Sequence, residues 1–317
     1  MKKRLVSLAV SAVILALLWR SVDPAAIWAA AEQAAPAWFW AAVAFTIPLT
    51  LATAWRFAAL SSGSVGAGES LRLILAASTL NMVLPSKMGD LAKAWILRRD
   101  GTMSGGRSLA LVVLEKLLDL WSLVAVGALA LAVTRPTLPG GEASLALALL
   151  VLWGGAVGLL LPMLAGRRAL APLLLVTRPL GKLHAKLTAL VEDWDALIGW
   201  FWLSPVRALA MLAGSLLLWA LHMVQIWLFA SAIGAVPLAL TMAFAVIAIL
   251  AGLLPFTFAG VGTRDAALVV LFAPYLDAGG AALLGLCATL RYLIPAIAGL
   301  PFVGAFWHAR PTEPQPN

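Results

Sequence analysis

The chain has 317 residues, of which 63% are hydrophobic and 11% charged, and its mean hydropathy is +0.99. Soluble globular chains are about 45–50% apolar and about 25% charged, so a folded aqueous surface cannot solvate this chain and the lipid bilayer has to be its solvent. The formal net charge of +8 does not indicate nucleic-acid binding, because most basic residues fall in short connections between apolar runs, as in membrane proteins.

Six apolar runs have about the length that a membrane span needs, roughly 17–25 residues. They cover residues 5–19, 36–60, 108–133, 143–164, 206–233 and 281–307. The first run follows Lys2, Lys3 and Arg4 and so mimics a signal peptide. We interpret it as an uncleaved span, because the chain continues as a membrane protein in any case. A short stretch at 24–33 is predicted to form an interfacial helix.

Two further apolar segments, residues 71–97 and 238–275, are interrupted by proline, glycine and charged residues. Proline removes a backbone donor and clashes with the preceding turn of a helix. Non-helical backbone at membrane depth needs protein or a water-filled cavity around it. We therefore predict a re-entrant hairpin or a broken helix in each segment. The interruptions are Asn81, Pro85, Lys87, Gly89, Asp90 and Lys93 in the first segment and Pro255, Gly260, Gly262, Arg264 and Asp265 in the second.

These elements together predict an all-α, polytopic membrane helical bundle of about eight membrane segments. We expect a single integral membrane domain over residues 1–317. Its pseudo-halves cover about residues 1–165 and 200–310, and a basic cytoplasmic connection at 166–204 joins them.

The distribution of Lys and Arg predicts the orientation. If the N-terminus is cytoplasmic and both broken segments turn back, the cytoplasmic side receives Arg98, Arg107 and the basic cluster at 178–186, while only Arg20 and Arg135 fall outside. We therefore expect a multi-pass protein of a bacterial inner membrane with both termini cytoplasmic. The two broken segments then enter the membrane from opposite faces, as an inverted pair.

The two broken segments also repeat one pattern, in which a proline and a glycine precede an acidic residue and then a span with a buried charge. Asp90 lies 25 positions before Glu115, and Asp265 lies 26 positions before Arg291. Such interrupted segments in the two halves of a chain indicate the central site of a transporter. Two unrelated kinked helices would give the same pattern, and this alternative stays open.

Charges within the spans are the sharper signal. Glu115 and Arg291 are expected on the order of 10–18 Å deep, too far from either surface to snorkel easily. Glu115 and Asp119 share a helix face, and Lys116 is three residues from Asp119. Either a structural ion-pair network or a polar cavity for a charged ligand would explain them. One of the two acids should lie near a basic partner, with Lys116, Arg264 and Arg291 as candidates.

Helix ends favour an anion at such a site. Asp90 and Thr263 are predicted N-caps of half-helices whose positive ends point into the membrane interior. Nearby basic side chains would favour a phosphate, and nearby acids would keep the bare site close to neutral. The basic side chains are Lys87, Lys116, Arg264 and Arg291, and the acids are Asp90, Glu115, Asp119 and Asp265.

Other candidate sites are weaker. His222 and Gln225 share a face of an apolar span, where an interhelical hydrogen bond is the expected role and lining of the cavity is the alternative. The single cysteine, Cys287, excludes an intramolecular disulfide and a cysteine-based zinc site. Glu115 and Asp119 could hold a divalent metal for phosphoester chemistry, but a lysine between them disfavours it. No nucleotide-binding or hydrolase motif occurs, so we expect no catalytic residue, no metal and no cofactor.

Several of these motifs resemble a known family. The stretch 81–93 and the sequence Glu115-Lys-Leu-Leu-Asp119 are similar to the flippase-like family, which shares its fold with the membrane half of lysylphosphatidylglycerol synthases. The stretch 254–265 with the later Arg291 resembles that family's Pro…Gly-x-Gly-x-x-acid motif and arginine, and Trp55-Arg56 is similar too. The resemblance covers nearly the whole chain.

Three positions depart from the family pattern: Ala259, Lys116 and Asp265 stand where glycine, arginine and glutamate are common. Size and charge are nearly kept, so the departures concern ligand geometry more than fold. The resemblance implies an eight-segment protein that moves or presents a lipid between leaflets. The synthases add a soluble aminoacyl-transferase domain; this chain ends at Asn317, and we expect no aminoacylation from it.

The leading hypothesis is a non-catalytic lipid translocator that binds an anionic lipid or lipid-linked headgroup. Its expected partners are membrane lipids and not nucleic acid, with a homo-oligomer or an enzyme of a lipid pathway as further possibilities. The alternatives are an intramembrane enzyme on a lipid phosphate and an accessory subunit of a glycolipid or hopanoid pathway. The expected substrate-binding residues are Asn81, Pro85, Lys87, Gly89, Asp90, Glu115, Lys116, Asp119, Pro255, Gly260, Gly262, Arg264, Asp265 and Arg291.

Overall fold

The structure is a computed structural model that describes residues 24–84, 88–253 and 262–308. These residues form helices joined by short connections, and no strand occurs among them. The predicted first span at 5–19 lies outside the described residues, as do Pro85, Lys87, Pro255 and Gly260.

Five helical stretches of the described chain are long and apolar enough to cross a membrane. They are α3 with α4 (Pro36–Ala44 and Thr46–Leu60), α7 (Gly105–Thr134), α8 (Gly141–Ala165), α11 (Pro205–Ile233) and α14 (Ala278–His308). Each agrees with a predicted apolar run, so the polytopic helical membrane fold is confirmed. The stretch at 24–33 forms a helix as predicted, α2 (Pro24–Gln33).

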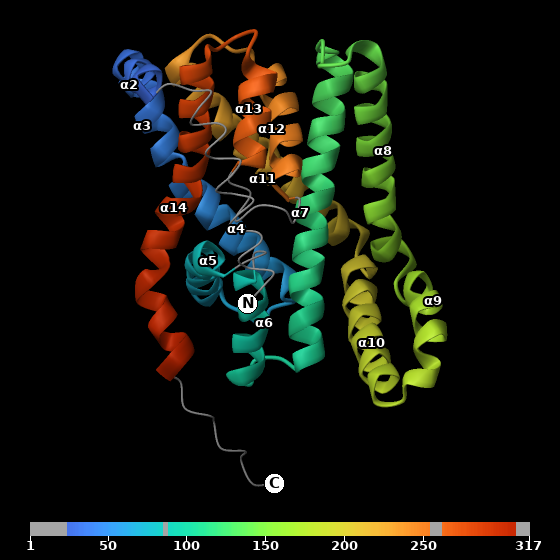
Figure 1. Cartoon of the computed structure of the whole chain (residues 1–317). Coiled ribbons are helices and arrows are strands. Elements are labelled where there is room, and N and C mark those ends of the chain that lie inside the picture. The colour runs from blue at the N-terminus through green and yellow to red at the C-terminus, as the bar shows by residue number, and fades with distance from the viewer. Residues whose placement is uncertain (1–23, 85–87, 254–261, 309–317) are drawn as a thin grey trace.

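Both interrupted segments are broken helices, as predicted. The first consists of α5 (Ala67–Val83) and α6 (Gly89–Arg99), and the second of α12 (Leu238–Leu253) and α13 (Thr263–Phe272). In Figure 1, α5 and α6 lie at the lower end of the bundle, whereas α12 and α13 lie at the upper end. Each pair is followed by a long helix, α7 or α14, which runs from that end of the bundle to the other. The order of elements is therefore repeated with inverted direction.

The two halves are joined by crossed contacts. Helix α5 packs against α14, and α12 packs against α7, so the first helix of each broken pair lies against the long helix of the other half. A glycine permits each close approach. A Cβ at Gly299 of α14 would collide with the carbonyl oxygen of Leu75, and a Cβ at Gly127 of α7 would collide with the side chain of Val246.

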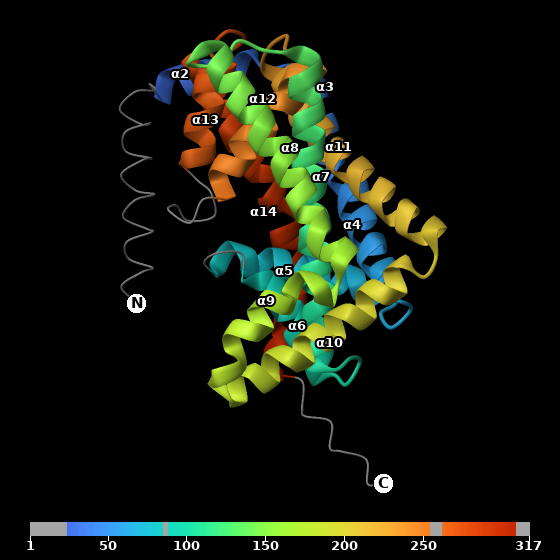
Figure 2. The same ribbon diagram turned by 90° about the vertical axis from the view of Figure 1, so that its right-hand side faces the viewer.

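The connection at 166–204 is more ordered than a polar loop. It forms α9 (Arg167–Thr177), a short 3₁₀ helix η2 (Arg178–Leu180) and α10 (Lys182–Trp202). Helix α10 packs against α9 and α7, and the hairpin extends beyond the lower end of α8 (Figures 1 and 2). The sequence did not predict these helices, because their charged residues lower the hydropathy of the segment below that of a membrane span.

The buried apolar residues form two clusters that share α7. The lower cluster includes residues 110–118 of α7 together with α4, α5, α6 and α10. The upper cluster includes residues 123–131 of α7 together with α11, α12, α13 and α14. The charged stretch from Glu115 to Asp119 therefore lies where the two clusters meet, and the candidate site is built there.

Candidate functional site

A cavity of about 400 Å³ lies where the two halves meet. Its walls come from α4, α5, α6, α7, α11, α12 and α14. Six of the predicted binding residues line it: Asn81, Asp90, Glu115, Lys116, Asp119 and Arg291. Gly89, Gly262, Arg264 and Asp265 are described but are not among the lining residues.

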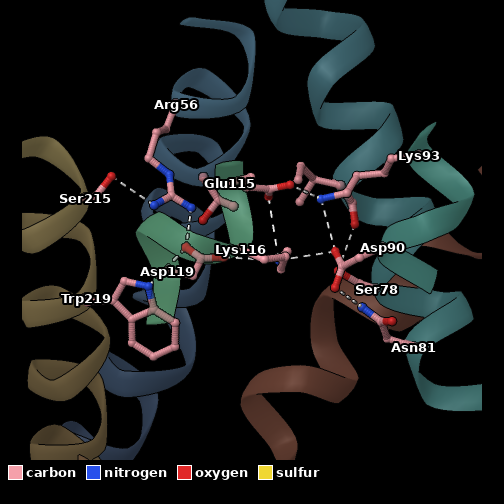
Figure 3. Close-up of polar contacts among 12 residues, drawn as sticks. Arg56, Ser78, Asn81, Asp90, Lys93, Glu115, Lys116, Asp119, Ser215 and Trp219 are labelled. Atoms are coloured by element: carbon pink, nitrogen blue, oxygen red, sulfur yellow. Dashed lines mark hydrogen bonds and ion pairs between the residues drawn. The ribbon is translucent and has the colours of Figure 1, made fainter. Parts of the chain in front are cut away.

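The first half contributes a network of six charged side chains beside this cavity (Figure 3). Three are cationic and three anionic, so their formal charges cancel. The pairs are Lys93–Glu115 at 2.5 Å, Lys93–Asp90 at 3.0 Å, Lys116–Asp90 at 3.3 Å, Lys116–Glu115 at 3.8 Å, Lys116–Asp119 at 3.1 Å, and the close pair Arg56–Asp119.

Lys93 and Glu115 form the most deeply buried pair. The exposed fractions of their side chains are 0% and 1%. The ammonium of Lys93 also lies 4.9 Å from the ring centroid of Phe57, a cation–π distance. Because a buried charge is tolerated only with a hydrogen-bonded counter-charge, this pair holds α6 against α7.

Asp119 connects α7 to two other helices. Arg56 of α4 donates to its carboxylate, and the indole Nε1 of Trp219 on α11 donates to it at 3.1 Å. Arg56 also donates to the hydroxyl of Ser215, again on α11, at 3.1 Å. The sequence prediction that one of the acids would have a basic partner is confirmed for Lys116, whereas neither Arg264 nor Arg291 pairs with Glu115 or Asp119.

Asp90 lies in the first turn of α6 and is not its N-cap. The helix begins at Gly89, which lies so close to α5 that a Cβ there would meet Asn81. The carboxylate of Asp90 accepts a hydrogen bond from the amide nitrogen of Asn81 at 3.3 Å and pairs with both lysines of the network. The N-cap is Met88, so the prediction of Asp90 is wrong by two positions, and the carboxylate of Asp90 is neutralised by lysines.

The second half uses its charges differently. Arg264 is buried and pairs with the adjacent Asp265 at 2.6 Å. Asp265 also accepts from the backbone N–H of Gly262 at 3.1 Å, so this carboxylate occupies the N-terminus of α13. Gly262 has φ +104°, which glycine adopts without strain. Thr263 is the first residue of α13 and not its N-cap, and it does not line the cavity.

Arg291 is the exception among the buried cations. It is 5% exposed and lines the cavity, yet it contacts no carboxylate within the described parts of the chain. It donates to the carbonyl oxygen of His222 at 3.4 Å and to the hydroxyl of Tyr292 at 2.5 Å, and its guanidinium lies 4.6 Å from that ring centroid. No acidic side chain of the described residues therefore balances its positive charge.

Of the two residues on α11, Gln225 makes the predicted interhelical hydrogen bond, whereas the buried Nδ1 of His222 has no hydrogen-bond partner among the described residues. The amide nitrogen of Gln225 donates to the carbonyl oxygen of Ala42 at 3.0 Å and to the hydroxyl of Thr46 at 2.8 Å, so it forms an interhelical hydrogen bond. His222 lines the cavity beside Arg291.

Sequence reasoning missed three members of the site: Arg56, Lys93 and Trp219. Arg56 was visible as an arginine in an apolar run, and Lys93 lies three residues after Asp90, a spacing that favours pairing on a helix. Nothing in the sequence could have indicated Trp219, because the contact joins residues 100 positions apart. Among the described residues, no group of three or more His, Cys, Asp and Glu side chains could hold a metal ion.

Long apolar helices around a charged interior define a multi-pass integral membrane protein. Residues 4–299 match the family model of the lysylphosphatidylglycerol synthase transmembrane region, and the chain belongs to this family. A comparison with curated proteins found no match.

Proposed function

We propose that this protein binds the anionic headgroup of a membrane lipid or lipid-linked molecule in the central cavity and moves it between the two leaflets. The observation that carries the proposal is Arg291, a buried cation that lines the cavity and has no acidic partner among the described residues. An unbalanced charge inside a membrane is costly, and a ligand anion would supply the missing counter-charge.

The charge of the surrounding network supports the same sign of ligand. The three cations and three anions of the first half cancel, so this network together with Arg291 carries a formal charge of +1. Arg56 and Lys93 belong to the network but do not line the cavity. A guanidinium binds phosphate through charge-assisted hydrogen bonds, which are stronger in a site shielded from water. A phosphate or another anionic headgroup is therefore the favoured occupant.

The size of the cavity supports a headgroup and not a whole lipid. Its volume of about 400 Å³ is near the lower end of the range for small-molecule sites, roughly 300–1,000 Å³. Acyl chains would remain in the bilayer while the headgroup enters. The apolar part of the lining, which includes Leu49, Ile249 and Leu253, suits the adjoining chain segments.

The inverted arrangement supports movement between leaflets. The broken pairs α5–α6 and α12–α13 lie at opposite ends of the bundle (Figure 1), and the cavity lies between them. In transporters with inverted repeats, two oppositely oriented units can rock about a fixed central site and open it to each side in turn. The lower end, which carries Arg98, Arg99 and the α9–α10 hairpin, is proposed to be cytoplasmic in a bacterial inner membrane.

A leaflet-resolved assay tests the proposal. The protein is reconstituted into liposomes with a fluorescent anionic lipid analogue that an added reductant quenches in the outer leaflet only. Arg291→Gln should slow the crossing of the anionic analogue by about tenfold, which corresponds to roughly 1.4 kcal/mol. The matched control is Arg72→Gln, because Arg72 forms a surface ion pair with Glu69 and does not line the cavity.

Equal crossing of anionic and zwitterionic analogues, unchanged by Arg291→Gln, would contradict the proposal. Turnover of a lipid phosphate by the pure protein would instead support an intramembrane enzyme. If the protein neither transports nor converts lipid but retains an enzyme of a lipid pathway through purification, the accessory role would replace both.

A further inference from the structure

The hairpin tip, which comprises residues 175–186 at the junction of α9, η2 and α10, exposes apolar and basic side chains together. Four large apolar side chains are about half exposed or more: Leu175 at 57%, Val176 at 75%, Leu180 at 52% and Leu183 at 49%. Arg178, Lys182 and Lys186 are exposed on the same short stretch. The hydroxyl of Thr177 lies 3.3 Å from Nδ1 of His184, so the two arms of the hairpin are in contact.

The basic residues of the hairpin tip have no acidic partner within the described ranges of the chain. Two of the acids on α10 are occupied elsewhere. Asp193 lies against Gly106 in the first turn of α7, and Asp195 accepts from the backbone N–H of Arg167 at 2.8 Å, at the start of α9. Negative charge is favourable at both helix N-termini. The third acid, Glu192, is exposed farther along α10, so the tip itself carries only positive charge.

The position of the tip fits a membrane surface. In both views the hairpin tip lies at the lower end of the bundle, near the level of the C-terminal ends of α6 and α14 (Figures 1 and 2). Helix α6 ends there with Arg98 and Arg99. A span has to leave the hydrocarbon region at the level where arginines gather, because their charge requires headgroups or water.

We propose that the hairpin tip docks onto the anionic headgroups of the leaflet beside it. Its apolar side chains enter the boundary between headgroups and acyl chains, and its three basic side chains contact lipid phosphates. Exposed leucine or valine beside unpaired lysine and arginine is the composition of interfacial segments that bind anionic membranes. This surface lies outside the central cavity, and its role does not depend on transport.

The test uses the full chain with one fluorescent label. Cys287→Ser removes the native cysteine, and Ala185→Cys places a bimane label on an exposed position of the tip. In nanodiscs that contain phosphatidylglycerol, a neutral aqueous quencher, which the lipid charge does not repel, should quench the label at least about threefold less than in pure phosphatidylcholine. Raising the salt from about 0.1 M to about 1 M should remove the difference, because the Debye length falls from roughly 10 Å to roughly 3 Å.

Two variants separate the role of charge from the role of folding. The triple substitution Arg178→Gln, Lys182→Gln and Lys186→Gln should make quenching equal in the two lipids. Glu192→Gln, a change of the opposite sign on the same helix, should keep the difference. Both variants should have the same elution volume in size-exclusion chromatography and the same unfolding temperature as the parent protein.

Three results would overturn the proposal. One is access of the neutral quencher that is equal in the two lipids. Another is a difference between lipids that survives in the triple variant. The last is shielding that rises with the number of protein copies per disc, which would assign the tip to contact with a second copy.

Discussion

The two halves of the bundle share an order of helices but use charge in different ways. In the first half, ion pairs hold the broken pair to its long helix: Lys93 joins α6 to Glu115 of α7, and Lys116 joins α7 to Asp90. In the second half, Arg264 reaches from α13 to neutral acceptors of α14, the carbonyl oxygen of Gly285 at 3.2 Å and the hydroxyl of Thr289 at 2.7 Å.

The two halves therefore combine the same order of helices with different pairing of their buried charges. Among its described residues, the first half pairs each buried charge with another of its own side chains, as a structural network requires. The second half balances Arg264 with Asp265, whereas Arg291 faces the cavity with no carboxylate partner in the described ranges. We infer that the first half provides the rigid wall of the site and the second half provides its unsatisfied charge. The following substitutions test that division.

The largest expected effect belongs to the buried pair of the first half. Lys93→Met leaves the carboxylate of Glu115 without its nearest counter-charge at 1% exposure, so we expect a loss of about 3–5 kcal/mol in the free energy of unfolding. Unfolding in mixed detergent and SDS micelles measures it. Adding Glu115→Leu should recover part of the loss.

Lys116→Met is the matched control, because the side chain of Lys116 is 44% exposed and Asp119 retains Arg56. We expect it to cost less than Lys93→Met. An equal loss from both lysine variants would show that the network is not centred on the buried pair.

The second half offers a sharper contrast between two arginines. Arg264→Gln removes the partner of Asp265 and should cost about 2 kcal/mol of stability, the scale of hydrogen bonds to charged groups. Arg291→Gln removes a charge that has no acidic partner among the described residues, so it should cost less than about 1 kcal/mol while weakening anionic lipid binding. For each variant, unfolding curves measure the loss of stability and lipid-binding isotherms on the same samples measure the loss of affinity. The reverse order of stabilities would mean that Arg291 is structural.

The contact between α14 and α5, which joins the two halves, can be tested by adding a single methyl group. Gly299→Ala places a Cβ against the carbonyl oxygen of Leu75 and the hydroxyl of Thr79, so α14 and α5 have to separate. We expect a loss of about 1–3 kcal/mol, as for an overpacked core. Gly304→Ala on the same helix is the control, since nothing lies within 4 Å of its Cβ position. Similar melting temperatures for the two variants would show that α14 and α5 can separate at this contact without loss of stability.

The smallest expected effect concerns Gln225. Gln225→Leu removes hydrogen bonds to Ala42 and Thr46 between α11 and the α3–α4 helix. Interhelical hydrogen bonds in membranes contribute about 0.6 kcal/mol on average, so thermal stability should fall slightly and lipid crossing should remain unchanged. Gln225 lines the cavity, so a marked loss of crossing would show that its side chain contacts the transported headgroup.

The sequence by itself determined the class of fold and the ends of most long helices. A span needs an apolar run of about 20 residues, and a proline or a charge inside such a run stays visible whatever surrounds it. The same local rules predicted both broken helices and the acids at 90, 115 and 119. They also predicted Gln225 as an interhelical donor, but not the helices of the 166–204 connection.

Only the tertiary structure decided which charges meet. Arg56 and Asp119 are 63 positions apart, Arg56 and Ser215 are 159 apart, and no local pattern relates them. The sequence placed Arg264 and Arg291 in one anion site, whereas folding pairs Arg264 with its neighbour Asp265 and gives Arg291 only neutral partners among the described residues. The reason is physical: burial makes an unpaired charge costly, so each side chain takes the partner that helix packing brings within reach, and that packing depends on contacts far apart in the chain.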